Sequence, residues 1–233
     1  RARVGDLPEI PYFYDDLTAG EFLEFYARLQ GIPASLRGER VRRTLARVGL
    51  ADRVRSALRK FSKGMIQRVG LAQAIQHDPD LVILDEPMSG LDPAGRREVR
   101  DLVLELRSAG KTVFFSSHIL QDAEMLCDRV AILQRGRTRS QGRLQELVSS
   151  AVRWIEVSVR GPLPDLGEAE TLSASGEESL LRVSDLAALG PLLEAVQRGG
   201  GQVLSVWPKR ETLEDLFLRE TGGKDGMEAT EER

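Results

Sequence analysis

Two adjacent carboxylates, Asp85 and Glu86, are the residues of this sequence that are best suited to chemistry. They follow a short run of branched apolar residues, Leu81 to Leu84, which is typical of a parallel strand buried on both faces. Open α/β sheets bind their ligands at the carboxyl ends of such strands. One acid could hold Mg²⁺ and its neighbour could orient and deprotonate a water molecule. The pattern favours a nucleotide-hydrolysis site, although a strand that ends in a solvated acidic turn is a common alternative.

A second candidate site, the segment Phe61 to Met65, lies upstream of this strand and immediately before an amphipathic helix. Ser62 is a good N-cap, and Gly64 lets a ligand approach the backbone closely. The free N–H groups and the positive end of the helix dipole make the helix start a candidate anion site. An ordinary capped helix would explain the segment taken alone, but its position ahead of the acidic strand favours the anion site.

The scaffold that must hold these side chains is predicted from hydrophobic patterning. From residue 62 onward, helices and strands alternate: helix about 63–77, strand 81–85, helix about 94–108, strand 112–117, helix about 119–126 and strand 129–134. Alternation at this spacing is typical of right-handed crossovers in a largely parallel sheet. The predicted fold class is therefore α/β.

The segment ahead of this alternation is predicted to be a helical subdomain, over about residues 15–62. Thr18 stands three residues before Glu21, which is the pattern of a capping box, and opens an amphipathic helix that ends near Gly31. A second helical pattern covers about residues 39–48, and a third short one precedes residue 61.

The pattern changes after residue 134. A hairpin turn is predicted at residues 134–137 and a helix at 143–149, so that the first domain spans residues 1–150. Weaker alternation predicts strands at 153–159, 179–184 and 202–207, with helices at 185–197 and 211–220. We interpret residues 151–220 as a small α+β domain and residues 221–233, which are charged, as a disordered tail.

Composition excludes several classes of protein. The 233 residues have a net charge of −3 with no basic field, which disfavours nucleic acid as a partner. A single cysteine, Cys127, allows no internal disulfide and fits a reducing cytosol. The apolar runs are far shorter than the roughly 20 residues that cross a bilayer. Because Arg1 is not methionine and no leader pattern follows it, we predict that the sequence is cut from a longer chain.

Over residues 1 to about 150, the order of these motifs resembles that of the nucleotide-binding subunits of ATP-binding cassette (ABC) transporters. Phe61 to Met65 is similar to their signature loop, with Lys63 in place of a glycine and Met65 in place of a glutamine. The strand that ends in the acidic pair resembles their Walker B strand. The D-loop corresponds to residues 89–92, the switch histidine to His118, and the Q-loop glutamine to Glu9.

This resemblance implies a P-loop NTPase-type ABC ATPase fold, with ATP and Mg²⁺ as cofactors. It assigns the metal to Asp85 and Glu9, and general-base catalysis to Glu86. His118 would contact the terminal phosphate. The remaining positions would bind nucleotide across an interface between two ATP-binding domains; they are Ser62, Lys63, Gly64, Met65 and Asp92.

The phosphate loop GxxxxGK[ST], which supplies most phosphate contacts in that family, does not occur in the sequence. Residues 90–97 have two glycines at the right separation but Arg96 and Arg97 where Lys and Ser/Thr belong. Residues 110–112 read GKT, but they run from a helix into a strand, whereas a phosphate loop runs from a strand into a helix. We predict that this Walker A loop lies before Arg1, and that the chain alone is inactive.

The leading hypothesis is a cytoplasmic motor subunit, bound at the inner face of the cell membrane by a separate transmembrane permease and paired with a second ATP-binding domain. The aromatic, acidic stretch from Pro11 to Leu17, with the following helix, is the expected permease contact. The degenerate signature, Glu9 and the ending TLEDLFLRE resemble the subgroup that serves ABC-2 type exporters.

Two alternatives stay open. A soluble ABC-type ATPase that acts on nucleic acid or ribosomes would carry coiled-coil insertions, basic arms or a tandem second cassette. The 52 residues between Glu9 and Ser62 contain no sustained heptads and no basic cluster, which favours the transporter. The other alternative is a catalytically inactive scaffold that begins at Arg1 and partners an intact cassette.

Overall fold

The computed structural model describes residues 3–11, 13–148, 152–163, 167 and 169–221. The chain forms two compact units, Arg1–Leu126 and Cys127–Arg233, which we describe separately. The division falls ahead of the boundary predicted near Ser150. The reason is that strand β4 (Arg129–Gln134) pairs with β5 (Arg137–Arg143) in a sheet of its own and does not extend the parallel sheet among the described residues.

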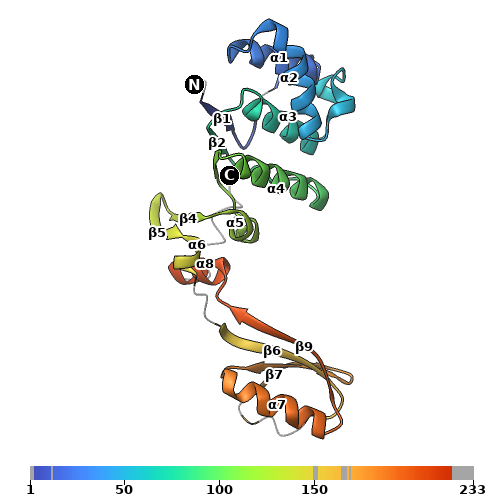
Figure 1. The fold of residues 1–233 in the computed structure, drawn as a ribbon, viewed down its shortest axis with the longest axis vertical. Coiled ribbons are helices and arrows are strands. Elements are labelled where there is room, and N and C mark those ends of the chain that lie inside the picture. Colours follow the sequence, from blue (N-terminus) through green and yellow to red (C-terminus); the bar gives the residue numbers. More distant parts are fainter. Residues whose placement is uncertain (1–2, 12, 149–151, 164–166, 168, 222–233) are drawn as a thin grey trace. The chain divides into compact units, whose positions relative to one another are not determined.

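The first unit contains a parallel sheet of three strands in the order β1-β2-β3, of which Figure 1 labels β1 and β2. Strand β2 (Leu81–Leu84) lies between β1 (Val4–Leu7) and β3 (Thr112–Phe115), and the register aligns Leu7, Leu84 and Phe115 at the carboxyl end. The predicted parallel sheet is confirmed. Strand β1 was not predicted, because a strand of four residues that includes Gly5 shows little hydrophobic periodicity.

Helices cover one face of this sheet. Helix α3 (Lys63–Ile75) packs on β1, and α4 (Pro93–Ser108) packs on β3. Gly5 is required where α3 crosses β1, because a Cβ at this position would lie 1.9 Å from the carbonyl oxygen of Ala74. The residues that face the helices are buried; they include Leu7, Val82 and Leu84.

The opposite face of the sheet is not covered by the described residues. Ile83 is 39% exposed and Phe114 is 65% exposed, and Val4 belongs to the same exposed set. The prediction that Leu81 to Leu84 is buried on both faces was therefore wrong for this chain. The apolar run arises because both sets of alternating residues are apolar, whereas only one set is packed.

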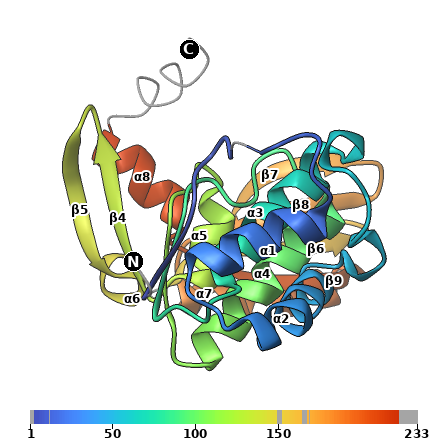
Figure 2. The same ribbon diagram turned by 90° about the horizontal axis from the view of Figure 1, so that it is seen from above.

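Helices α1 (Ala19–Leu29) and α2 (Ala34–Arg47) lie side by side in the first unit and both contact α3 (Figures 1 and 2). The capping box predicted for α1 is confirmed, since the Thr18 hydroxyl accepts a hydrogen bond from the Glu21 N–H and the Glu21 carboxylate accepts one from the Thr18 N–H. Two short 3-10 helices, Ala51–Arg53 and Leu58–Lys60, complete the predicted helical subdomain. The shared core includes Phe22, Leu23, Leu45 and Leu58.

In the second unit, β4 and β5 form the predicted hairpin. Its turn places Arg135 and Gly136 at positive φ, 50° and 72°, as a tight hairpin turn requires. The helix predicted at 143–149 is shorter, because Arg143 still belongs to β5 and α6 covers only Leu144–Leu147. Helix α8 (Leu213–Thr221) contacts the hairpin, and the Gln134 side chain donates a hydrogen bond to the Thr221 carbonyl.

The second unit also contains an antiparallel sheet in the order β7-β8-β6-β9, with α7 (Leu186–Arg198) packed against it. The strands are β6 (Val152–Arg160), β7 (Glu170–Ser175), β8 (Glu178–Val183) and β9 (Gln202–Arg210). The α+β pattern was predicted except for β7. This strand is exposed at every position and therefore carries no hydrophobic signal. The tail predicted to be disordered falls, from residue 222, outside the described residues.

No helix in the described ranges combines the length and the apolar composition that crossing a bilayer would need.

Candidate active site at the edge of the parallel sheet

Asp85 and Glu86 begin where β2 ends, and the neighbouring strands hold them at the carboxyl edge of the sheet. The N–H of Asp85 donates a 2.8 Å hydrogen bond to the carbonyl of Leu7, the last residue of β1. On the other side, the N–H of Ser116 donates to the Leu84 carbonyl at 3.0 Å. Parallel pairing therefore continues past the strand ends and fixes the backbone that leads into Asp85.

His118 lies three residues beyond β3, and its ring meets the second acid. The His118 Nδ1 is 2.8 Å from the Glu86 Oε2. The Glu86 side chain is only 19% exposed, whereas that of His118 is 61% exposed. A carboxylate held between the sheet edge and an accessible imidazole is arranged to exchange a proton with a molecule bound beside it. The structure thus brings Asp85, Glu86 and His118 to one edge, as the sequence predicted.

Ser116 also belongs to this cluster, although the sequence analysis did not single it out. Its hydroxyl donates a 2.5 Å hydrogen bond to the Asp85 Oδ1 and accepts a 2.9 Å bond from the Glu86 N–H. The available signal was the position of Ser116 directly after an apolar strand that neighbours the acidic strand. Serine at a strand end is so common that its type alone does not indicate function.

Glu9 is placed at the same edge of the sheet but is not joined to the cluster. It follows β1 by two residues, is exposed, and makes no hydrogen bond or ion pair with Asp85, Glu86 or His118 among the described residues. Within the described ranges, no three acidic, histidine or cysteine side chains converge as a complete cation cage. An oxygen donor set of one or two carboxylates nevertheless fits Mg²⁺, which keeps several water ligands and also binds substrate phosphates.

The segment Phe61 to Met65 and the loop 89–92 lie against each other. Ser62 is the N-cap of α3, since its hydroxyl accepts from the Met65 N–H at 3.3 Å. Asp92 is the N-cap of α4, because its carboxylate accepts from the Gly95 N–H at 2.8 Å. Both residues predicted to bind nucleotide therefore have a capping role within this chain.

Glycines allow the close contact between these two loops. A Cβ at Gly90 would lie 2.8 Å from the Lys63 Nζ, so the lysine that replaces a signature glycine runs over the D-loop backbone. A Cβ at Gly64 would lie 3.1 Å from Leu91. The start of α3 and the loop before α4 thus form one packed surface.

Two hydrogen bonds connect this surface to the acidic pair. The buried amide of Gln67, on α3, donates to the Pro87 carbonyl at 3.4 Å. The Ser89 N–H donates to the Glu86 carbonyl at 3.0 Å. The two candidate sites found in the sequence are therefore parts of one hydrogen-bonded structure, joined through the loop that follows Glu86.

His77, the other histidine, has a structural role. Its Nε2 lies 3.1 Å from the Val4 carbonyl, and burial lowers the pKa of the ring, an effect only partly offset by that hydrogen bond. A neutral imidazole that donates to a backbone carbonyl is the expected state of such a residue.

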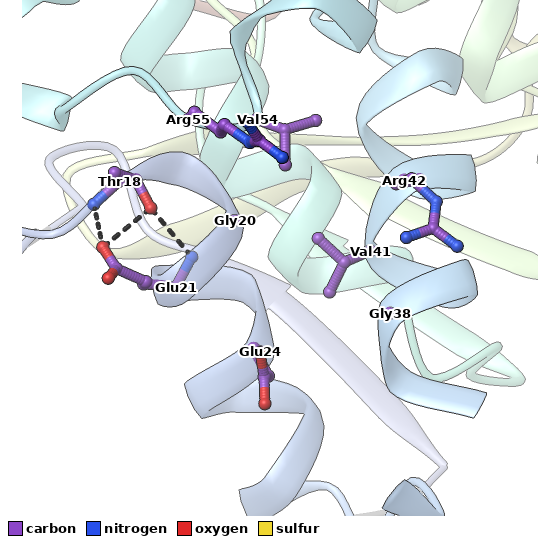
Figure 3. Close-up of a pocket in the computed structure, with 9 residues that line it drawn as sticks. All are labelled: Thr18, Gly20, Glu21, Glu24, Gly38, Val41, Arg42, Val54 and Arg55. Carbon is purple, nitrogen blue, oxygen red and sulfur yellow. Dashed lines mark hydrogen bonds between the residues drawn. The ribbon is translucent and has the colours of Figure 1, made fainter. Parts of the chain in front are cut away.

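A groove of about 580 Å³ lies apart from these residues, between α1, α2 and the segment that follows the first 3-10 helix (Figure 3). Acidic side chains from α1 and arginines from the other walls line it, together with small residues. The lining consists of Thr18, Gly20, Glu21, Glu24, Gly38, Val41, Arg42, Val54 and Arg55. It contains none of the predicted catalytic residues.

The parallel sheet with acids at its carboxyl edge is of the α/β type that the sequence predicts. A family profile described as "ABC transporter" matches residues 1–89. An uncharacterized ABC transporter ATP-binding protein of Nostoc sp. is 42% identical over 97% of this chain and 68% of its own length. This chain therefore belongs to the family of ABC transporter ATP-binding proteins.

Two further comparisons agree with this assignment. The Nod factor export ATP-binding protein I of Cupriavidus metallidurans is 34% identical over 95% of this chain and 74% of its own length. A solved structure of an ATP-binding subunit of an ABC transporter is 34% identical with a TM-score of 0.58, and it covers 63% of this chain. The chain spans 61% of that solved chain and about two thirds of the Nostoc relative.

Proposed function

We propose that this chain carries the hydrolytic acids of an ATP-driven ABC exporter subunit and powers transport through a separate membrane permease. The observation that carries the proposal is the 2.8 Å contact of His118 with Glu86, next to Asp85, at the carboxyl edge of a parallel sheet. Phosphoryl transfer to water requires a base for the attacking water, a carboxylate for the metal ion, and an accessible edge where the phosphate can bind.

In the proposed reaction, Glu86 takes a proton from a water molecule whose oxygen attacks the terminal phosphorus of ATP. The bond between that phosphorus and the bridging oxygen breaks, and ADP leaves with the electron pair. His118 holds the Glu86 carboxylate in position and offers a hydrogen bond to the transferred phosphoryl group. Asp85, with Glu9 nearby, would hold Mg²⁺, which when bound neutralises phosphate charge.

A second ATP-binding domain completes the proposed site. The start of α3, with Ser62, Lys63, Gly64 and Met65, would face ATP bound to that partner, and Asp92 would lie at the junction. The packing of this loop on residues 89–92, and the bond from Ser89 to Glu86, support this role because they link the interface to the base. Without a phosphate loop in its 233 residues, the chain alone is expected to hydrolyse little ATP.

The proposed permease contact is an aromatic and acidic surface formed by residues ahead of α1 and by exposed side chains along this helix. Tyr14 packs edge-on against Phe25 with ring centroids 6.2 Å apart, yet Tyr14 is 51% exposed. Leu29, one turn after Phe25, is 68% exposed. Asp15 and Asp16 stand beside this patch. Cytoplasmic loops of membrane proteins are rich in Lys and Arg, so a permease loop would meet acids here and bury apolar surface.

The direction of transport is proposed to be export. Support comes from the relative in Cupriavidus metallidurans that is named for Nod factor export, and from the α+β unit and final helix that follow the ATPase segment. The proposed location is the cytoplasmic face of the membrane, where the permease would hold the protein.

A Glu86→Gln substitution in the complete gene product that contains this chain tests the proposal. Glutamine keeps the size and the contact with His118 but cannot accept the proton. We expect ATP-dependent dimerisation, measured by light scattering, to be retained while kcat falls by at least about a hundredfold. Glu146→Gln, on an exposed residue of α6, is the matched control and should hydrolyse ATP normally. Near-normal turnover in Glu86→Gln would contradict the proposal.

A further inference from the structure

Ser116 is placed by the sheet itself directly beside the acidic pair. The register pairs Leu84 with Phe115, so the next step brings Asp85 level with Ser116. The Ser116 N–H is already bound to the Leu84 carbonyl at 3.0 Å, which fixes the backbone from which its hydroxyl projects. A short side chain on a fixed backbone can hold its hydroxyl accurately.

The chemistry of the partners determines the direction of both Ser116 hydrogen bonds. A backbone N–H can only donate, so the bond from Glu86 uses an oxygen lone pair of Ser116 at 2.9 Å. The hydroxyl proton is then free to be donated to the Asp85 Oδ1 at 2.5 Å, which is the short distance typical of a hydroxyl bound to a carboxylate. Accepting one bond strengthens the donation of the other.

Glu86 needs such restraint because its backbone is in an unfavourable conformation. Its φ is +45°, in the left-handed region that residues with a side chain seldom occupy. Three contacts oppose relaxation: the Ser116 hydroxyl binds its N–H, the Ser89 N–H binds its carbonyl, and His118 binds its carboxylate. Strained residues of this kind persist only where several contacts hold them in place.

We propose that Ser116 is a positioning residue for hydrolysis, which holds the Asp85 carboxylate and the Glu86 backbone in a fixed relation through one hydroxyl. The inference rests on the proposed function of the two acids. Removal of the hydroxyl frees Asp85 Oδ1 and the Glu86 N–H together, so the base and the metal-binding acid lose their common support. Ser116 itself need not touch the substrate.

The first test measures this restraint without turnover, by amide hydrogen exchange in the complete gene product. Ser116→Ala should accelerate exchange of the Glu86 amide on the order of threefold to tenfold, the effect of one lost hydrogen bond. Ser116→Thr keeps the hydroxyl and should restore protection. Ser117→Ala is the matched control, because the Ser117 hydroxyl accepts from the Ile119 N–H at 3.0 Å. Ser117→Ala should accelerate hydrogen exchange of the Ile119 amide and leave exchange of the Glu86 amide unchanged.

The second test separates positioning from general stability. Ser116→Ala should lower kcat for ATP hydrolysis roughly tenfold to a hundredfold, as misplacement of a catalytic group does, with KM within about twofold. The melting temperature should stay within about two degrees, since Ser116 is exposed and its loss leaves no cavity. Ser116→Thr should recover most of the rate, and Ser108→Ala, at the far end of α4, should match the unsubstituted protein.

The outcomes of the two tests are distinguishable. Unchanged Glu86 exchange in Ser116→Ala overturns the positioning role whatever the protein catalyses. Normal kcat in Ser116→Ala, in a protein that hydrolyses ATP and depends on Glu86, overturns it as well. If the unsubstituted protein hydrolyses no ATP but Ser116→Ala still exposes the Glu86 amide, the proposed function fails while the structural restraint stands.

Discussion

Residue types that are rare at a given position were the ones whose placement in the fold could be predicted. Two consecutive acids at the end of an apolar strand, and a histidine after the next strand, are unusual enough to predict one shared site, and in the structure His118 contacts Glu86. The Ser116 hydroxyl binds both acids, but serine is so common at strand ends that the sequence did not indicate this role. Asp92 illustrates the opposite case, because the side chain expected at the nucleotide interface caps a helix within the chain. A capping residue and a ligand-binding residue have the same sequence signal, since both satisfy free N–H groups.

His77 provides a residue-scale prediction about pH. Because burial lowers its pKa from the ordinary value of 6.5, the folded protein holds the proton less tightly than the unfolded chain does. The unfolded chain therefore binds more protons between the lowered pKa and about 6.5. This histidine should stabilise the fold above that window, and the contribution should be lost as the pH falls through it.

The measurement is an NMR titration of the two imidazoles, assigned with His77→Gln, together with urea unfolding at a series of pH values. The His77 resonance should titrate below 6.5. The decline in stability on mild acidification should be smaller in His77→Gln, which has no ring to protonate. A midpoint at or above 6.5 would mean that the contact with the Val4 carbonyl outweighs burial.

At the scale of elements, segments with their own strong signal were predicted and segments defined by their neighbours were not. Helix α1 has a capping box and a clear apolar face, and it was predicted close to its observed bounds. Strands β1 and β7 were missed, because Gly5 and Asp6 interrupt the apolar pattern of β1 and β7 has no buried face. The exposed face of β2 could not be seen from Leu81 to Leu84 either, since burial depends on what packs against the strand.

The N-cap of α1 gives a prediction at this scale. The Thr18 hydroxyl satisfies an N–H that the helix cannot, so Thr18→Ala should destabilise the first unit by about 1 kcal/mol. Thr18→Ser keeps the oxygen and should stay close to the unsubstituted protein. The check is to measure the stability of the first unit in urea, with amide hydrogen exchange in α1 as the probe. Equal loss of stability in the serine and alanine variants would show that the methyl group of Thr18 matters and the cap does not.

At the scale of the whole chain, the two compact units contain separate apolar cores. The first core includes Leu45 and the residues around α3, and the second is formed by β6, β8 and α7 with Leu181 at its centre. No residue is shared between these two described clusters. Because cooperativity follows from shared packing, the units should unfold in separate transitions. This separation lets the stability of the first unit be changed without altering the unit that follows it.

Paired core substitutions test this independence. Leu181→Ala and Leu45→Ala each remove a fully buried side chain, and each should cost about 2–5 kcal/mol. Both tryptophans, Trp154 and Trp207, lie in the second unit, so their fluorescence reports its unfolding alone. Leu181→Ala should lower the urea midpoint of the fluorescence transition, whereas Leu45→Ala should leave it in place and accelerate amide exchange in α2 and α3. If both variants shift a single common transition equally, the two cores unfold as one and the first unit is stabilised by the unit that follows it.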